Sequence, residues 1–207
     1  MYRKLVIVLA LALFPNNLGA QEIGFDLQIA NPFTSIFRLE NTSTETTARI
    51  FGFSAFIGDT TYNFDIVGNE QILFDTGDPL NSTLVVGDDQ QGGVRTDDLA
   101  YEFTGFEIGD RFQFSVDLDL DTGDSGADLR EIYFNNGDAV PNALLAVDFE
   151  FSGQTRRLEL LLPDDPLVGD PQVFDFSVSQ SVPEPSTAIL LLAVSVVGIC
   201  TRRKIAR

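Results

Sequence analysis

The chain lacks histidine and tryptophan, and its single cysteine, Cys200, lies close to the C-terminus. The absence of histidine excludes Ser-His-Asp and Cys-His catalysis, imidazole acid–base chemistry and the usual zinc sites. Lysine is absent between residues 21 and 185, where seven arginines stand against all 31 acidic residues, so the net charge of this region is −24. Because phosphate groups are bound by clustered lysine and arginine, nucleic acid is excluded as a partner.

The first 20 residues have the pattern of a secretory signal peptide. Arg3 and Lys4 precede an apolar run from residue 5 to residue 14, and small residues stand at positions 19 and 20. The run is well short of the about 20 residues that a spanning helix needs. We therefore predict a signal peptide over residues 1–20, cleaved after Ala20 during export across the inner membrane. A retained N-terminal anchor is the alternative.

The C-terminus has the opposite character. Residues 185–201 carry no charge and, as a helix, would be about 25 Å long, close to the thickness of a membrane core. Basic residues are retained on the cytoplasmic side, so we predict a transmembrane helix over about residues 186–201 with the acidic domain outside. A cytoplasmic stop then follows in the tail 202–207, formed by Arg202, Arg203 and Lys204. A buried terminal helix is the alternative, but the segment lacks a polar face.

The segment 182–207 resembles a known sorting signal. Val182-Pro183-Glu184-Pro185-Ser186-Thr187 is followed by the short apolar stretch and the Arg-Arg-Lys tail. This order is similar to the PEP-CTERM signal of Gram-negative bacteria. The resemblance implies processing by exosortase, a membrane enzyme thought to act at Pro183, Glu184 and Pro185. It also implies membrane anchoring before processing, a final place at the cell surface or in the matrix, and association with exopolysaccharide and biofilm. The signal implies location and carries no activity.

Residues 21–181 form the predicted acidic domain. Apolar and polar residues alternate along most of it, and Gly/Asp turns separate the alternating segments. This pattern predicts an all-β fold, a two-sheet antiparallel β-sandwich of jelly-roll type. A single helical turn is expected near residues 97–100. The predicted strands cover residues 23–29, 34–40, 50–57, 62–67, 71–75, 82–86, 101–107, 112–120, 130–134, 144–151, 155–162 and 173–178.

One cluster of carboxylates has the spacing of a cation site. It consists of Asp117, Asp119, Asp121, Asp124 and Asp128, all within twelve residues. Carboxylates at positions 1, 3, 5 and 12 match a calcium loop, although glycine stands at position 7 instead of 6. We therefore hypothesise a Ca²⁺ site with these five ligands. The alternative is a solvated acidic face of one strand, on which Asp117, Asp119 and Asp121 point outward.

The function of the domain follows less directly from its residues. The 18 phenylalanines are expected to fill the core, and Tyr62, Tyr101 and Tyr133 are the better candidates for stacking against a sugar. Catalysis would have to use carboxylates alone, and nothing marks one pair among so many acids. We predict a non-catalytic surface or matrix protein without a cofactor, except for calcium. The alternatives are a carbohydrate-binding module, with or without calcium, and a carboxylate glycosidase of matrix polysaccharide.

Overall fold

The computed structural model describes residues 20–30, 35–59, 61–65, 71–76, 81–86, 95–120, 128–134, 141–164 and 173–182. Residues Glu22–Gln180 form one compact unit, and the terminal segments form another. The elements are β1 (Gln21–Ala30), β2 (Ser35–Asn41), β3 (Arg49–Phe56), β4 (Tyr62–Asp65), β5 (Gln71–Thr76), β6 (Asn81–Val86), β7 (Arg95–Thr96), β8 (Asp98–Phe106), β9 (Arg111–Leu120), α2 (Leu129–Tyr133), β10 (Leu144–Phe151), β11 (Gln154–Leu161) and β12 (Val173–Val182).

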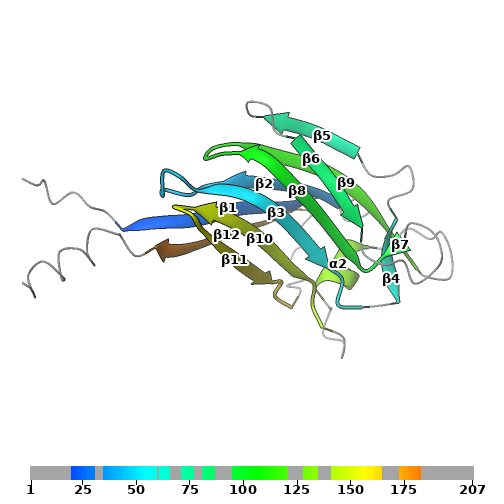
Figure 1. The fold of residues 1–207 in the computed structure, drawn as a ribbon. Helices are drawn as coiled ribbons and strands as arrows, with labels where there is room; N and C mark the ends of the chain where they lie inside the picture. Colours follow the sequence, from blue (N-terminus) through cyan, green and yellow to red (C-terminus); the bar gives the residue numbers. More distant parts are fainter. Residues whose placement is uncertain are drawn as a thin grey trace, which may run out of the picture. The chain divides into compact units, whose positions relative to one another are not determined.

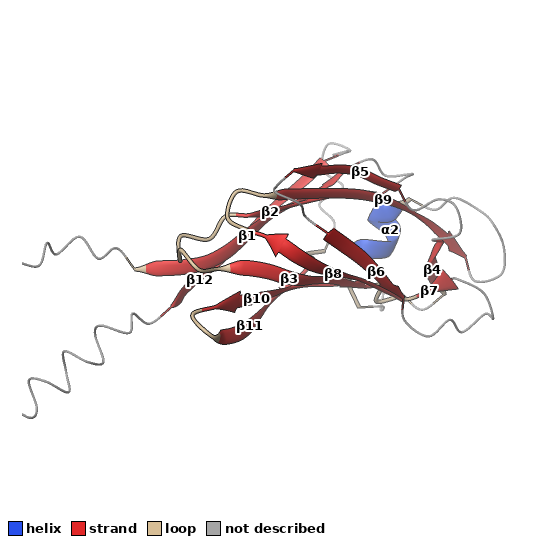
Figure 2. Cartoon of the chain, turned by 45° about the horizontal axis from the view of Figure 1, so that its top comes forward, coloured by secondary structure: helices blue, strands red, loops and turns tan. Residues whose placement is uncertain are grey.

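The strands form two sheets. The larger sheet has the order β12-β1-β2-β9-β4-β7, with β5 pairing β9 beside this path. The smaller sheet has the order β11-β10-β3-β8-β6 and lies in front of β1 and β2 in Figure 1. The chain changes sheet after β2, β3, β5, β6, β7, β8, β9 and β11. The predicted two-sheet antiparallel sandwich is therefore confirmed, and Figure 2 shows its two layers.

Aromatic side chains from both sheets meet between the layers. Phe37 and Phe114 of the larger sheet are stacked, with ring centroids 4.8 Å apart. Phe53 and Tyr101 of the smaller sheet lie 5.8 and 4.7 Å from Phe114. Because all four rings are at most 1 % exposed, this cluster forms the centre of the core. The expectation that most phenylalanines fill the core is confirmed.

The prediction for residues 130–134 was wrong, because these residues lie in or directly after helix α2. The carboxylate of Asp128 accepts a hydrogen bond from the backbone N–H of Arg130 and caps the helix. The buried residues are Leu129, Ile132 and Tyr133, which follow helical spacing of three and four, not the alternation of a strand. The helical turn expected near residues 97–100 was also wrong, since β8 begins at Asp98.

The first and last strands of the domain are neighbours. The Nε2 of Gln28 donates to Oδ1 of Asp175 at 2.7 Å, and a Cβ added at Gly24 would lie 3.0 Å from the Cβ of Ser179. These two contacts show that β12 runs antiparallel to β1 and that it approaches closely where glycine leaves room. The end of β12 that leads to the sorting segment therefore lies beside the start of β1.

Candidate functional site

The outer face of the smaller sheet is ordered in rows by its strand register. The first row crosses all five strands and consists of Arg157, Asp148, Gly52, Glu102 and Thr83. The next row consists of Glu159, Ala146, Ser54, Ala100 and Val85. The row after that consists of Leu161, Leu144, Phe56 and Asp98. A charged row, a row with small residues at its centre and a largely apolar row therefore follow one another along the strands.

Small residues hollow out the middle of this face. Gly52, Ser54 and Ala100 occupy neighbouring positions on β3 and β8, where larger side chains would fill the surface. The hollow has a volume of about 560 Å³ and is also lined by Glu102, Asp148 and Arg157. We call it the trough. A cavity of this size is within the range of small-ligand sites, which are about 300–1,000 Å³.

Two exposed phenylalanines stand on the strand that forms the floor of the trough. Phe51 lines the trough directly, and Phe56 lies five residues further along β3. Their exposed fractions are 38 % and 39 %, whereas most phenylalanines of the described residues are buried. At about 3.3 Å per residue, the two positions are about 16 Å apart along the strand. The trough therefore has an apolar ring on its floor strand and another beyond it.

A β-bulge turns Phe51 outward. The pairing of β3 with β10 shifts between Asp148 and Phe149, so that two steps on β3 oppose one step on β10. Ile50 and Phe53 are both buried although they are three residues apart, which strict alternation does not allow. The extra residue leaves Phe51 on the outer face beside Gly52.

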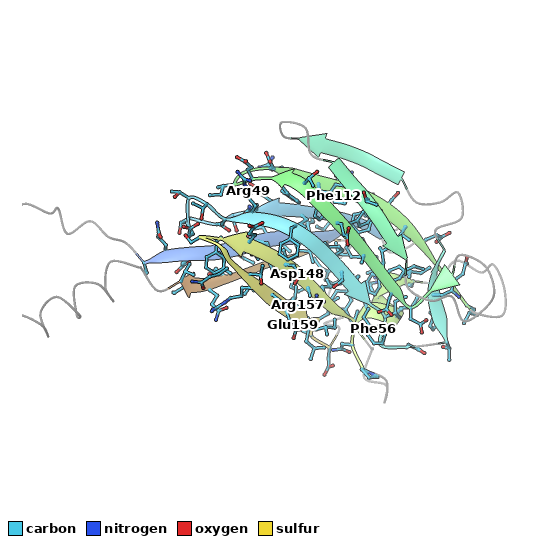
Figure 3. All side chains as sticks on the ribbon, viewed as in Figure 1. Arg49, Phe56, Phe112, Asp148, Arg157 and Glu159 are labelled. Carbon is cyan, nitrogen blue, oxygen red and sulfur yellow. The ribbon has the colours of Figure 1, made fainter. Side chains whose placement is uncertain are left out.

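An ion-pair network forms the β10–β11 side of the trough. The guanidinium of Arg157 donates to Oδ2 of Asp148 at 3.0 Å and to the hydroxyl of Ser54 at 2.7 Å. Its Nε lies 3.6 Å from the carboxylate of Glu159. Figure 3 shows Asp148, Arg157 and Glu159 gathered on this side of the sheet, with Phe56 near the end of β3. The network holds one guanidinium in a fixed direction at the edge of the hollow.

The opposite side of the trough carries Glu102, which is exposed. Its register partners are Gly52 on β3 and Thr83 on β6. The Asp148 carboxylate leans over the same glycine, since a Cβ added at Gly52 would lie 3.1 Å from its Oδ2. Two carboxylates thus stand on either side of Gly52, and the one of Asp148 covers this glycine.

A second groove, of about 620 Å³, lies on the outer face of the larger sheet. Its arginines are bound by neighbouring side chains, because Arg38 donates to Gln28 and Gln113, and Arg111 donates to Glu40 at 2.8 Å. The hydrogen bond and the negative charge of Glu40 raise the pKa of Arg111 above its ordinary value. These polar groups bind one another, as those of the trough do, but the phenylalanines that line this groove, Phe112 and Phe176, are less exposed than Phe51.

The calcium hypothesis is only partly covered by the described residues. Asp121 and Asp124 lie outside them, and the described part of the chain contains no group of three or more acidic or cysteine side chains arranged to hold a metal. Asp128 caps α2 and is paired with Arg130. The hypothesis of a calcium loop stays a prediction.

The alternative reading of these aspartates, a solvated face, needs a correction. Asp117 is half-buried and Asp119 is 3 % exposed. Both lie where β9 pairs with β4, and the register partner of Asp119 is Asn63, which is 2 % exposed. The end of β9 is thus enclosed where the sequence pattern suggested solvent.

Two of the three tyrosines proposed for stacking are in the core. Tyr101 is 1 % exposed and Tyr133 is fully buried, so neither ring is open to a sugar. Tyr62 is half-buried. The exposed aromatic rings are phenylalanines instead. Gly52 inside an apolar run was the available signal for the bulge and for the hollow, because glycine in a strand often marks one or the other.

The terminal segments lie almost entirely outside the described residues. Ala20, the predicted cleavage residue, is described and exposed, one residue before β1. At the other end β12 ends at Val182, directly before Pro183. In the described part of the chain, no helix has both the length and the hydropathy to cross a membrane. Pro183, Glu184, Pro185, the predicted helix 186–201, and Arg202, Arg203 and Lys204 are outside the described residues.

The C-terminal segment matches a known family model. The model describes the PEP-CTERM protein-sorting motif and matches residues 181–204. The chain carries this motif. The resemblance drawn from the residues alone is thereby confirmed for this segment, and the PEP-CTERM motif marks the protein for export and for sorting by exosortase, with membrane anchoring before processing. No curated protein and no solved structure shows significant similarity to the chain.

Proposed function

We propose that the exported domain is a non-catalytic protein of the cell surface or extracellular matrix that binds exopolysaccharide through the trough. The observation that carries this proposal is the trough itself. It combines a hollow of about 560 Å³ with an exposed apolar ring at Phe51 and with polar groups at Ser54, Glu102 and Arg157. Sugars present apolar ring faces and hydroxyl groups together, so a site for them needs both kinds of partner.

The shape of the site supports a polymer as the ligand. The trough lies on an open sheet face with Phe51 on its floor strand and Phe56 about 16 Å further along that strand. An extended chain can lie along such a face, and both of its ends can continue past the protein. The sorting motif supports a destination outside the inner membrane, where exopolysaccharide is available.

The state of the carboxylates supports binding without catalysis. The Asp148 carboxylate is held by the guanidinium of Arg157 at 3.0 Å, an ion pair that fixes its orientation. Glu102 is exposed, whereas a general acid is typically a carboxyl group in a hydrophobic pocket. These surroundings favour a binding role for both side chains over the role of a general acid.

A binding measurement with the full chain tests the proposal. The protein, solubilised in nonionic detergent, is titrated with exopolysaccharide oligomers and monitored by calorimetry. We expect Phe51→Ala to weaken binding by about fivefold to tenfold, since an exposed aromatic contact contributes about 1 kcal/mol. The matched control is Val173→Ala, which removes a similarly exposed apolar side chain on β12. Equal affinity for both variants would contradict the trough as the site, and new reducing ends in the mixture would contradict the absence of catalysis.

A further inference from the structure

The charges around the trough are unbalanced. Arg157 is the cation among the described residues that line the trough, and it already lies within 4 Å of the carboxylates of Asp148 and Glu159. Glu102 adds a third carboxylate on the other side of Gly52. The side chains of Asp148 and Glu159 are 25 % and 58 % exposed, so their charges act on a ligand in the hollow. The network with Glu102 therefore has a net charge of −2.

The rest of the domain strengthens this field. Residues 21–185 carry a net charge of −24 and no lysine. A surface potential of one sign concentrates ligands of the opposite sign and repels ligands of the same sign. Polysaccharides with uronate, sulfate or phosphate groups are therefore repelled from the trough, and neutral polysaccharides gain nothing from the charges.

We infer that the ligand of the trough is a polysaccharide whose sugars carry protonated amines, a partly deacetylated amino-sugar polymer. This inference rests on the proposed function and narrows it to one ligand class. An ammonium group that enters the hollow between Glu102 and Asp148 meets both carboxylates, because these residues are the two register partners of Gly52 and the Asp148 carboxylate leans over that glycine. A neighbouring ammonium group is also attracted by the face of an exposed aromatic ring such as Phe51. The hydroxyl groups of the sugar meet Ser54 and Arg157 at the floor and side.

The ion pair with Arg157 fixes the orientation of one carboxylate of the trough. Because Asp148 is oriented by Arg157, its carboxylate is held over Gly52 in the free protein, and little ordering is needed when a ligand arrives. Glu102 is exposed and has no such ion pair with any of the described residues, so it is the carboxylate whose charge can be removed with the least effect on the fold.

The experiment compares three oligomers of equal length on the full chain in nonionic detergent. They are a glucosamine oligomer, its fully N-acetylated form and a uronic acid oligomer, all at mildly acidic pH where the amines are protonated. We expect the glucosamine oligomer to bind at least about tenfold more tightly than the N-acetylated form, because two partly exposed ion pairs contribute about 1.4 kcal/mol together. We also expect its affinity to fall as the salt concentration rises.

Single substitutions test whether the preference for the free-amine oligomer depends on the trough. Glu102→Gln is expected to weaken glucosamine binding about fivefold and to leave binding of the N-acetylated form unchanged. The matched control, Asp26→Asn, removes one exposed carboxylate from the outer face of the larger sheet. Equal losses for the two variants would show attraction by net charge alone and would overturn the assignment to the trough.

The outcomes separate this inference from the proposed function. If the N-acetylated and the free-amine oligomers bind equally well and Phe51→Ala weakens both, the amine inference is overturned while exopolysaccharide binding at the trough stands. If the uronic acid oligomer binds best, the amine inference is likewise overturned. If no oligomer binds, both are overturned.

Discussion

Asp128 and Arg130 form a closed unit at the start of α2. The Oδ1 atom of Asp128 accepts from the backbone N–H of Arg130 at 2.9 Å, and both carboxylate oxygens accept from the guanidinium Nε at 2.9 Å. The two side chains are 18 % and 14 % exposed. The Asp128 carboxylate therefore caps the helix, and it also neutralises the charge of Arg130, whose side chain is largely buried.

This unit predicts a pH dependence of stability. Burial alone would raise the pKa of Asp128, but the hydrogen bonds from Arg130 and its charge together lower that pKa. Asp128 then stabilises the fold above its ordinary pKa of about 3.9, and the stabilisation is lost as the pH falls through the lowered pKa. Asp128→Asn keeps a capping side chain, so we expect a loss of about 1 kcal/mol near neutral pH that vanishes in strong acid.

Thermal or denaturant unfolding over this pH range measures the effect. Asp26→Asn is the control, because its carboxylate is exposed on β1. A loss for Asp128→Asn that is the same at every pH would mean that shape, and not charge, accounts for its contribution.

The aromatic core predicts a large difference between two phenylalanines. Phe114→Ala removes a ring that is 1 % exposed and stacks on Phe37, so the free energy of unfolding should fall by about 3–5 kcal/mol. Phe51→Ala removes a ring that is 38 % exposed and should lower it by about 1 kcal/mol. Denaturant titration of the two variants measures both values, and Phe114→Leu is the milder substitute if the alanine variant does not fold. Comparable losses at the two positions would contradict the assignment of core and surface.

Gly58 and Gly52 are expected to differ in how well they tolerate replacement by alanine. A Cβ added at Gly58 would lie 1.9 Å from the carbonyl oxygen of Pro141, which is backbone and cannot move aside cheaply. Gly58→Ala should therefore destabilise the fold by about 1–3 kcal/mol or more. At Gly52 the nearest atom is the end of the Asp148 side chain, 3.1 Å away, so Gly52→Ala should stay within about 1 kcal/mol of the parent. The midpoints of thermal unfolding rank the two variants, and an unaffected Gly58→Ala would contradict the close approach of residue 141.

The C-terminal pattern predicts a topology. Because Arg202, Arg203 and Lys204 are expected to stay on the cytoplasmic side, a reporter fused after Arg207 should remain in the cytoplasm while the domain is exported. Replacing the three basic residues by neutral ones should allow part of the fusion to cross. Protease accessibility of the reporter in intact cells measures the outcome. A reporter of the unaltered chain that is found on the far side of the inner membrane would contradict the predicted topology.

The calcium hypothesis makes its own prediction. Calcium bound by residues 117–128 should raise the midpoint of thermal unfolding, and a chelator should reverse the rise. The double variant Asp121→Asn, Asp124→Asn should abolish the response, because it removes two of the five predicted ligands. A midpoint that neither calcium nor chelator changes would support an acidic loop without a cation.

Local alternation was sufficient to predict most of the sandwich. The strands predicted around Phe53, Phe114 and Phe149 are confirmed. In an antiparallel sheet with one buried face, every second side chain is buried, so apolar and polar residues alternate along the sequence. It failed at α2, where Leu129, Ile132 and Tyr133 are buried with helical spacing in a segment of only five residues. So short a segment gives little periodicity, and the cap at Asp128 was instead interpreted as part of a cation site.

The candidate site was harder to foresee for a different reason. Arg157, Gly52 and Glu102 come from three strands and are brought into one row only by the pairing of the sheet. No local pattern encodes that register. The sorting motif differs from the trough in this respect. Its residues are consecutive in the sequence, so a family model matches the motif without any information about the fold.

Because β12 pairs with β1, the larger sheet can be completed only after nearly the whole domain has been exported. The larger sheet cannot gain its outermost strand until residues 173–182 have crossed the membrane, and these are the last residues before the sorting segment. A strand that joins the sheet across some 150 residues of intervening chain closes late, because the contact is between the two most distant parts of the domain. The strand that completes the larger sheet is thus the one that ends at the beginning of the sorting motif.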